Sequence, residues 1–94
     1  MLYAVKARFR PGTEDQRNAL SSDFSQHIRQ PLLHIRLLGA LVDGNGRRSG
    51  MLMLMEADGR ELVQNFLDQS PYSQQGLYDG LDIEELQIEA GSLG

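Results

Sequence analysis

The sequence contains no cysteine and no tryptophan, and only three of its 94 residues are proline. Without cysteine there is no disulfide, no thiolate nucleophile and no zinc–cysteine site, so stability must come from packing and association. No apolar run reaches the roughly 18 residues that a membrane-spanning helix needs. The N-terminus also lacks the basic and apolar segments of a signal peptide. We therefore expect a cytoplasmic protein that does not use a membrane.

The length and the charge distribution limit the choice of partners. A domain of this size buries only about 60 to 65% of the surface of its unfolded chain, so a monomer would be marginally stable. The net charge is -4, yet residues 1–48 carry eight Lys or Arg against four Asp or Glu, and the rest of the chain carries one against nine. We expect cross-strand pairs of Lys6 and Arg8 with Glu85 and Glu89. Because the arginines are not interleaved with aromatic residues, no nucleic-acid partner is expected.

Hydrophobic periodicity predicts six elements in the order βαββαβ. Residues 2–9 alternate between apolar and other side chains, which is typical of a strand. The remaining predictions are a helix from Thr13 toward Ile35 that Pro31 kinks or breaks, strands over residues 39–43 and 50–57, a helix capped by Asp58, and a strand over residues 81–90. The Gly44–Gly46 segment predicts a tight turn between the middle strands.

The third predicted strand indicates the architecture. Residues 51–55 read Met-Leu-Met-Leu-Met, so both faces of this strand should be buried. The helices of a ferredoxin-like α+β fold cover only one face of the antiparallel sheet. We expect the sheet of a second, identical subunit to cover the other face, which gives a homodimer packed sheet to sheet as a dimeric α/β barrel. The alternative is one sheet with an open apolar face, against which methionine packs adaptably.

Several short motifs carry a resemblance to a known family. They are His27, the tripeptide Ser70–Tyr72, the N-terminal strand over residues 1–5, Gly44 and Gly50. On these residues the chain resembles the YCII-like family of small dimeric α+β barrel proteins. The resemblance covers nearly the whole chain, so residues 1–94 are expected to form one YCII-like domain. It implies a cleft in which a histidine and an aspartate form a catalytic dyad.

In this chain the family histidine is His27, and Ser70 stands at the aspartate position. An aspartate would orient the imidazole and stabilise its charged form. A serine hydroxyl can accept a hydrogen bond from the ring but carries no charge, so His27 should be a weaker acid/base catalyst. Asp68 is a poor substitute because it points about 200° away around the helix. A purely structural His27 beside an apolar stripe remains the alternative.

The resemblance also implies ligand-binding positions. Phe24 stands where relatives often carry an arginine, and Met51 stands where they often carry a small residue. Both residues make the cleft more apolar, which favours a small aromatic or lactone-like ligand. Tyr72 is expected either to place its hydroxyl at the mouth of the cleft or to pack as an aromatic lid.

Other polar residues narrow the chemistry. His27 and His34 are seven residues apart, which on a helix separates them by about 10 Å, too far for one metal ion. No metal and no cofactor are expected. Arg10, Arg47 and Arg48 either anchor an acidic group or remain solvated beside a turn.

Two functions follow, and they differ in whether His27 moves a proton. In the first, a YCII-like protein binds a small metabolite near His27, as a degenerate enzyme whose acid/base catalysis is weakened or lost. In the second, the same fold is a non-catalytic interaction or regulatory module. A cofactor-free monooxygenase on the same barrel would need a site that the sequence does not display.

Overall fold

The first strand separates buried from solvent-facing side chains. In the computed structural model, which describes residues 1–93, every second residue from Tyr3 to Phe9 is buried in β1 (Leu2–Phe9). The residues between them are half-buried or exposed. The predicted period of two is therefore confirmed.

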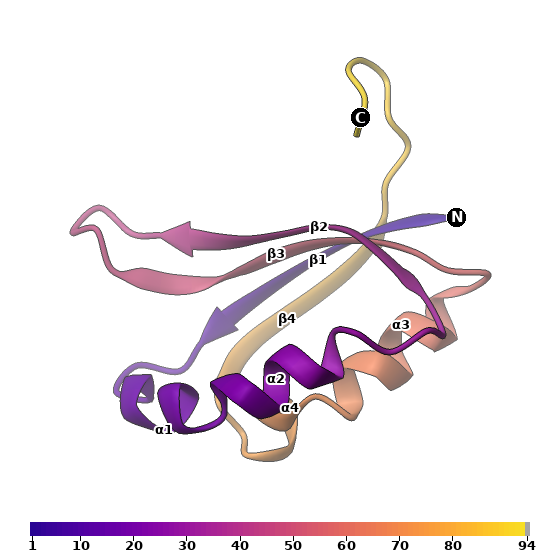
Figure 1. Ribbon diagram of the computed structural model, residues 1–94. Helices are drawn as coiled ribbons and strands as arrows, with labels where there is room; N and C mark the ends of the chain where they lie inside the picture. Colours follow the sequence, from indigo (N-terminus) through magenta and orange to yellow (C-terminus); the bar gives the residue numbers. More distant parts are fainter. Residues whose placement is uncertain (94) are drawn as a thin grey trace.

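The described chain forms a four-stranded antiparallel sheet, and each connection that crosses it contains two short helices (Figure 1). The further elements are α1 (Glu14–Ala19), α2 (Ser21–His27), β2 (His34–Val42), β3 (Arg48–Glu56), α3 (Arg60–Asp68), α4 (Pro71–Gln74) and β4 (Tyr78–Glu85). The strand order is β2-β3-β1-β4, and each neighbouring pair is antiparallel. This arrangement confirms the predicted α+β, ferredoxin-like fold.

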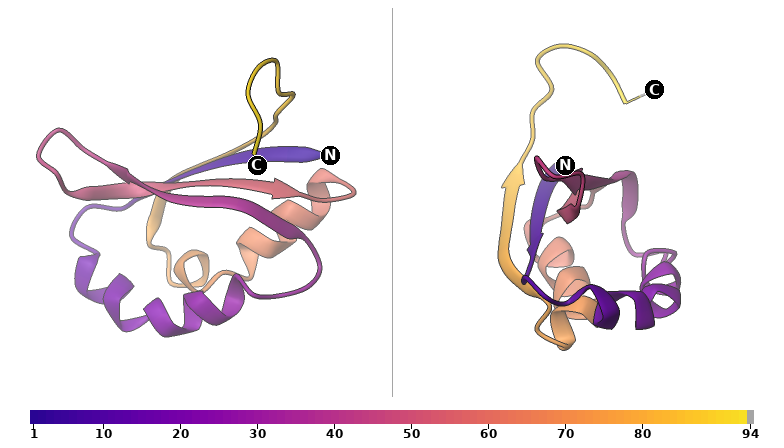
Figure 2. Two further views of the ribbon diagram at one scale, coloured as in Figure 1. Left: turned by 45° about the horizontal axis from the view of Figure 1, so that its top comes forward. Right: turned by 90° about the vertical axis from the view of Figure 1, so that its left-hand side faces the viewer.

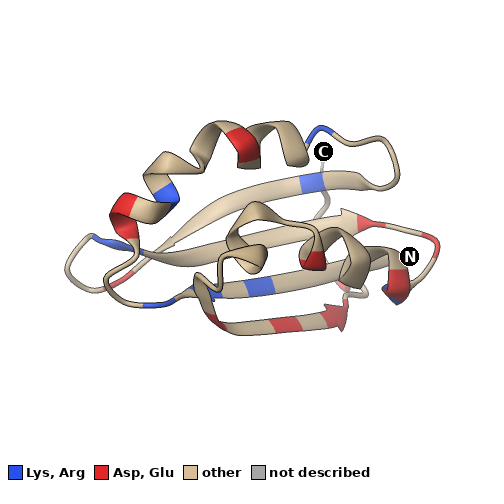
Figure 3. Cartoon of the chain, turned by 90° about the horizontal axis from the view of Figure 1, so that it is seen from below, with Lys and Arg blue, Asp and Glu red and all other residues tan. Residues whose placement is uncertain are grey.

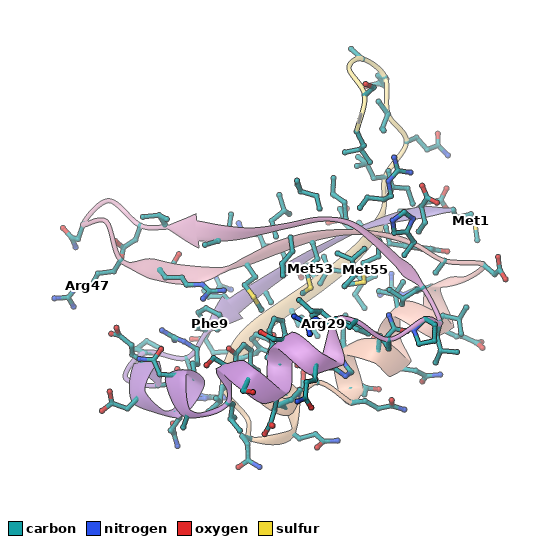
Figure 4. The ribbon with its side chains drawn as sticks, in the orientation of Figure 1. Met1, Phe9, Arg29, Arg47, Met53 and Met55 are labelled. Atoms are coloured by element: carbon teal, nitrogen blue, oxygen red, sulfur yellow. The ribbon has the colours of Figure 1, made fainter. Side chains whose placement is uncertain are left out.

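All four helices lie on one face of the sheet, and the core fills the space between them (Figures 1 and 2). Met51, Met53 and Met55 of β3 are fully buried there. Figure 4 shows Met53 and Met55 between the sheet and the helices. Full burial of such a side chain contributes roughly 1.5–3 kcal/mol. Phe66 and its neighbours on α3 close the core from the helical side.

Within residues 1–93, the opposite face of the sheet carries no helix (Figure 2). Leu52 and Leu54 of β3 lie on this face, and Leu54 is paired with Leu37 of β2. Leu37 is 46% exposed and Leu52 is half-buried. Leu54 is 9% exposed, so the burial expected for both faces of β3 is met only in part within one chain.

The first helical segment is shorter than the sequence predicts. It ends at His27, and Ile35 belongs to β2, where it pairs with Met55. Pro31 has no amide hydrogen and biases the residue before it toward extended backbone, so it ends the helical stretch completely. The His27 carbonyl accepts the backbone N–H of Gln30 at 3.4 Å.

The register of β4 changes the predicted charge pairs. Lys6 lies opposite Asp82, so the prediction that it pairs with Glu85 and Glu89 is wrong. The final strand begins and ends earlier than residues 81–90, which moves a different carboxylate beside Lys6. Figure 3 shows acidic residues along the edge strand β4 and a basic residue on the strand beside it. The attraction between the two halves of the chain is thus retained in another register.

Candidate functional site

His27 is the last residue of α2, and α3 holds its ring. Nε2 lies 2.7 Å from the carbonyl oxygen of Phe66, and the imidazole stacks on the Phe66 ring with 4.3 Å between centroids. A carbonyl oxygen only accepts hydrogen bonds, so Nε2 carries a proton. Nδ1 has no hydrogen-bond partner among the described residues and is not buried. It is therefore the ring nitrogen that is open to solvent.

Beside this ring lies a concavity of about 500 Å³ between α2 and α4, which we call the His27 groove. Its lining residues are Leu20, Asp23, Gln26, His27, Gln69, Pro71, Gln74 and Gln75. Four of them carry side-chain amides, which donate and accept hydrogen bonds. Asp23 lies four residues before His27, and this spacing places both side chains on one helix face. Asp23 is not among the predicted site residues, although the same spacing is visible in the sequence.

Ser70 precedes α4, and its side chain is only 1% exposed. Among residues 1–93 the Ser70 hydroxyl forms no hydrogen bond, so the expected hydrogen bond to His27 is not formed. The carbonyl of Phe66 takes that place. A neutral carbonyl fixes the tautomer of the imidazole, but it lacks the negative charge that would stabilise the imidazolium.

The Tyr78 hydroxyl is buried beside the Ser70 hydroxyl, and neither reaches hydrogen-bond geometry with a group of residues 1–93. Its burial raises the pKa of Tyr78 from 10.0 to about 12, and the neighbouring Ser70 hydroxyl offsets only part of this. The folded protein thus keeps this proton to a higher pH than the unfolded chain does. The free energy of unfolding should therefore fall by about 2 to 3 kcal/mol between about pH 10 and pH 12. Urea denaturation at several pH values should show this fall in the wild type, and its persistence in Tyr78→Phe would contradict the assignment.

The predicted ligand-binding residues are mainly packing residues. Phe24 and Met51 are buried, and neither lines the His27 groove. Tyr72 is 4% exposed and stacks on Phe24 with 4.5 Å between ring centroids. Its hydroxyl donates to the carbonyl oxygen of Arg17 at 3.5 Å. Tyr72 does line a second concavity, so it is the one predicted ligand residue that borders open space.

That second concavity measures about 870 Å³ and lies between the end of β1, α1 and the β2–β3 hairpin. We call it the arginine cleft, after its lining residues Arg8, Arg10, Arg17, Arg47 and Arg48. Phe9 and Tyr72 are the buried aromatic residues that border it. Figure 4 shows Phe9 at the end of β1 and Arg47 at the hairpin, on the same side of the molecule. The sequence indicated three of these arginines but not their convergence with Arg8 and Arg17.

The described residues bring no three histidine or carboxylate side chains together as a set of metal ligands. Within residues 1–93, no helix has the length and apolar character to cross a membrane.

No protein-family model and no curated protein sequence matches this chain. Among solved structures, the chain is similar to the 5-chloro-2-hydroxyhydroquinone dehydrochlorinase of Burkholderia phenoliruptrix in complex with 2,5-dihydroxybenzoquinone. The TM-score is 0.83 at 21% identity, over 93% of this chain and 94% of the other. A candidate antibiotic biosynthesis monooxygenase of Deinococcus radiodurans gives 0.53 at 13% identity, and both chains are fully covered. A NIPSNAP domain protein of Burkholderia xenovorans gives 0.51 at 12% identity, over 98% of this chain and all of the other. At these identities the likeness concerns the fold.

Proposed function

We propose that this chain is a single YCII-like domain that binds a small metabolite in the His27 groove. The proposal rests on the position of His27. This residue lines the groove beside Asp23, and its Nδ1 atom is open to solvent. The likeness in fold to a dehydrochlorinase solved with a dihydroxybenzoquinone supports a small, oxygenated aromatic or lactone-like ligand.

The groove suits such a ligand because its side chains complement hydroxyl and carbonyl groups. The amides of Gln26, Gln69, Gln74 and Gln75 offer donors and acceptors around the opening. Nδ1 of His27 accepts a hydrogen bond from a ligand hydroxyl in the neutral tautomer. The groove thus matches a ring with several oxygen substituents better than a hydrocarbon.

Acid/base catalysis in this groove is weak or lost. The partner of His27 is the neutral carbonyl of Phe66, and the residue at the family's aspartate position, Ser70, is buried and forms no hydrogen bond to His27. Neither group stabilises the charged imidazolium as an aspartate would. Binding is therefore the main function, and turnover is at most slow.

The domain acts as a homodimer in this proposal. The helix-free face carries Leu37 and Leu52, and neither is fully buried within one chain. A second copy related by a two-fold axis covers this face with the same residues. The resulting assembly has the sheet-to-sheet packing of a dimeric α/β barrel.

The binding proposal predicts that 2,5-dihydroxybenzoquinone raises the melting temperature of the wild type and not that of His27→Gln. A glutamine Nε2 replaces the donor to the Phe66 carbonyl but removes Nδ1, so this variant should melt near the wild type without ligand. A ligand at a hundred times its Kd stabilises by about 2.7 kcal/mol. Differential scanning fluorimetry over a panel of aromatic acids, catechols and lactones measures the effect.

The matched control for this experiment is His34→Gln, because His34 is exposed at the start of β2 and lies outside the groove. It should keep the full ligand response. An equal response in His27→Gln would contradict the groove as the binding site. The absence of any response in the wild type would favour the non-catalytic interaction module, in which His27 only packs on Phe66.

A further inference from the structure

The arginine cleft holds more positive charge than its own carboxylates neutralise. Five arginines line it, and the carboxylates that also line it are Glu14, Asp43 and Asp79. Asp79 forms an ion pair with Arg8 at 3.1 Å. Asp43 accepts the backbone N–H groups of the hairpin turn, and these hydrogen bonds hold its pKa below the usual value. Two of the three carboxylates, Asp43 and Asp79, therefore already accept hydrogen bonds from within the protein.

Two guanidinium groups of the cleft converge on one aromatic ring. The Cζ atom of Arg17 lies 4.0 Å from the centroid of Phe9, and that of Arg48 lies 5.5 Å from it. Neither arginine forms an ion pair with a described residue. Arg17 donates to the hydroxyl of Thr13 at 3.0 Å, whereas the guanidinium of Arg48 has no hydrogen bond within residues 1–93. The two like charges therefore repel each other, and contact with the ring offsets part of this repulsion.

An anion between these two groups would remove that repulsion. Guanidinium presents paired N–H donors that match a carboxylate or a phosphate group in two parallel hydrogen bonds. Two guanidinium groups from different elements, α1 and β3, match a ligand with two negative charges. We propose that the arginine cleft is a second binding site, for a small organic dianion such as a dicarboxylate or a phosphate ester, held by Arg17 and Arg48 above Phe9.

The shape of the cleft and the charge of the whole chain favour a small ligand over a polyanion. A volume of about 870 Å³ is within the usual range for small-molecule sites. The protein has a net charge of -4, so a long polyanion would meet repulsion outside the cleft. The site shares no lining residue with the His27 groove, so its occupancy is independent of the function proposed for that groove.

Isothermal titration calorimetry on the full chain at low salt tests this site. The probes are malate, glucose 6-phosphate and uncharged glucose. We expect saturable binding of malate or of glucose 6-phosphate, and none of glucose; whichever anion binds more tightly identifies the acidic group. Because a hydrogen bond to a charged group contributes strongly, Arg48→Gln and Arg17→Gln should each raise the Kd by about tenfold or more. Arg48→Lys, which keeps the charge but not the paired donors, should give a smaller loss.

The matched control is Arg29→Gln, which removes the same charge from an exposed residue outside the cleft. This variant and His27→Gln should bind the anion with a Kd within about twofold of the wild type, since neither residue lines the site. Arg48 is exposed, and its variants lose a 5.5 Å contact with the Phe9 ring but no side-chain hydrogen bond within residues 1–93, so they should melt close to the wild type. The proposal is overturned if no anion binds saturably or if Arg29→Gln weakens binding as much as Arg48→Gln. Tighter binding of a short oligonucleotide than of both small anions would also overturn it.

Discussion

Replacement of Gly50 by alanine is expected to lower the free energy of unfolding by about 3 kcal/mol or more. A Cβ atom at this position would lie 2.2 Å from the carbonyl oxygen of Ala7 and 3.2 Å from its carbonyl carbon. Both are backbone atoms of β1, which lies between β3 and β4, so neither can move without breaking the sheet. Thermal and urea denaturation followed by circular dichroism should show a melting temperature about 12 to 24 °C below that of the wild type.

The matched control is Gly44→Ala in the β2–β3 hairpin. A Cβ atom at Gly44 would meet no atom within 4 Å, and Gly44 does not have a positive φ. The same chemical change should therefore alter the free energy of unfolding by less than about 1 kcal/mol. If Gly50→Ala melted like Gly44→Ala, the pairing of Gly50 with Arg8 would be incorrect. The close approach of the Ala7 backbone is thus a physical reason for a glycine at position 50, one of the residues on which the family resemblance depends.

The central strands were predictable because a strand with a regular period can be recognised from adjacent residues alone. The alternation from Tyr3 to Phe9 and the apolar run from Met51 to Met55 each define a strand without knowledge of the rest of the chain. The Gly44–Gly46 turn similarly connects two strands that pair in the structure. Once the order of elements was known, the ferredoxin-like sheet followed from the short hairpin and the two helical crossovers.

β2 was harder to predict because its alternation is interrupted. The pairing register shifts between Ile35 and Leu37, so residues before and after the irregularity do not follow one period of two. Leu32 and Ile35 instead continue the helical spacing of the preceding segment, which led to the longer predicted helix. Only pairing with β3 shows that Ile35 is a strand residue.

The candidate sites depended even more on tertiary structure. The partner of His27 is the backbone carbonyl of Phe66, and a backbone group leaves no signature in the sequence. The arginine cleft joins Arg8, Arg17 and Arg48, which the fold brings together from β1, α1 and β3. The sequence could identify the residue types that carry charge, but not the empty space that they surround.

The wild-type protein is expected to be a dimer with twice the chain mass of 10.5 kDa, and Leu37→Lys combined with Leu52→Lys is expected to give monomers. Both leucines lie on the helix-free face of the sheet, and Leu37 is 46% exposed in one chain. In a two-fold interface each substitution occurs twice, so the variant would bring four additional lysine side chains into the interface. The dissociation constant should rise by about 100-fold or more. Light scattering at micromolar concentration, combined with sedimentation, measures both values.

Leu32→Lys is the matched control, because Leu32 is 74% exposed and lies between α2 and β2, away from the strands. It should leave the dimer intact, since the same charge change there meets solvent. A monomeric wild type would mean that the apolar sheet face is simply open and that adaptable packing within one chain is sufficient. A wild-type dimer that both lysine variants leave intact would place the interface elsewhere. Dissociation caused only by the sheet substitutions would show that the apolar face of β3 contacts a second copy. The helices of one chain lie on the other face of the sheet and cannot cover it.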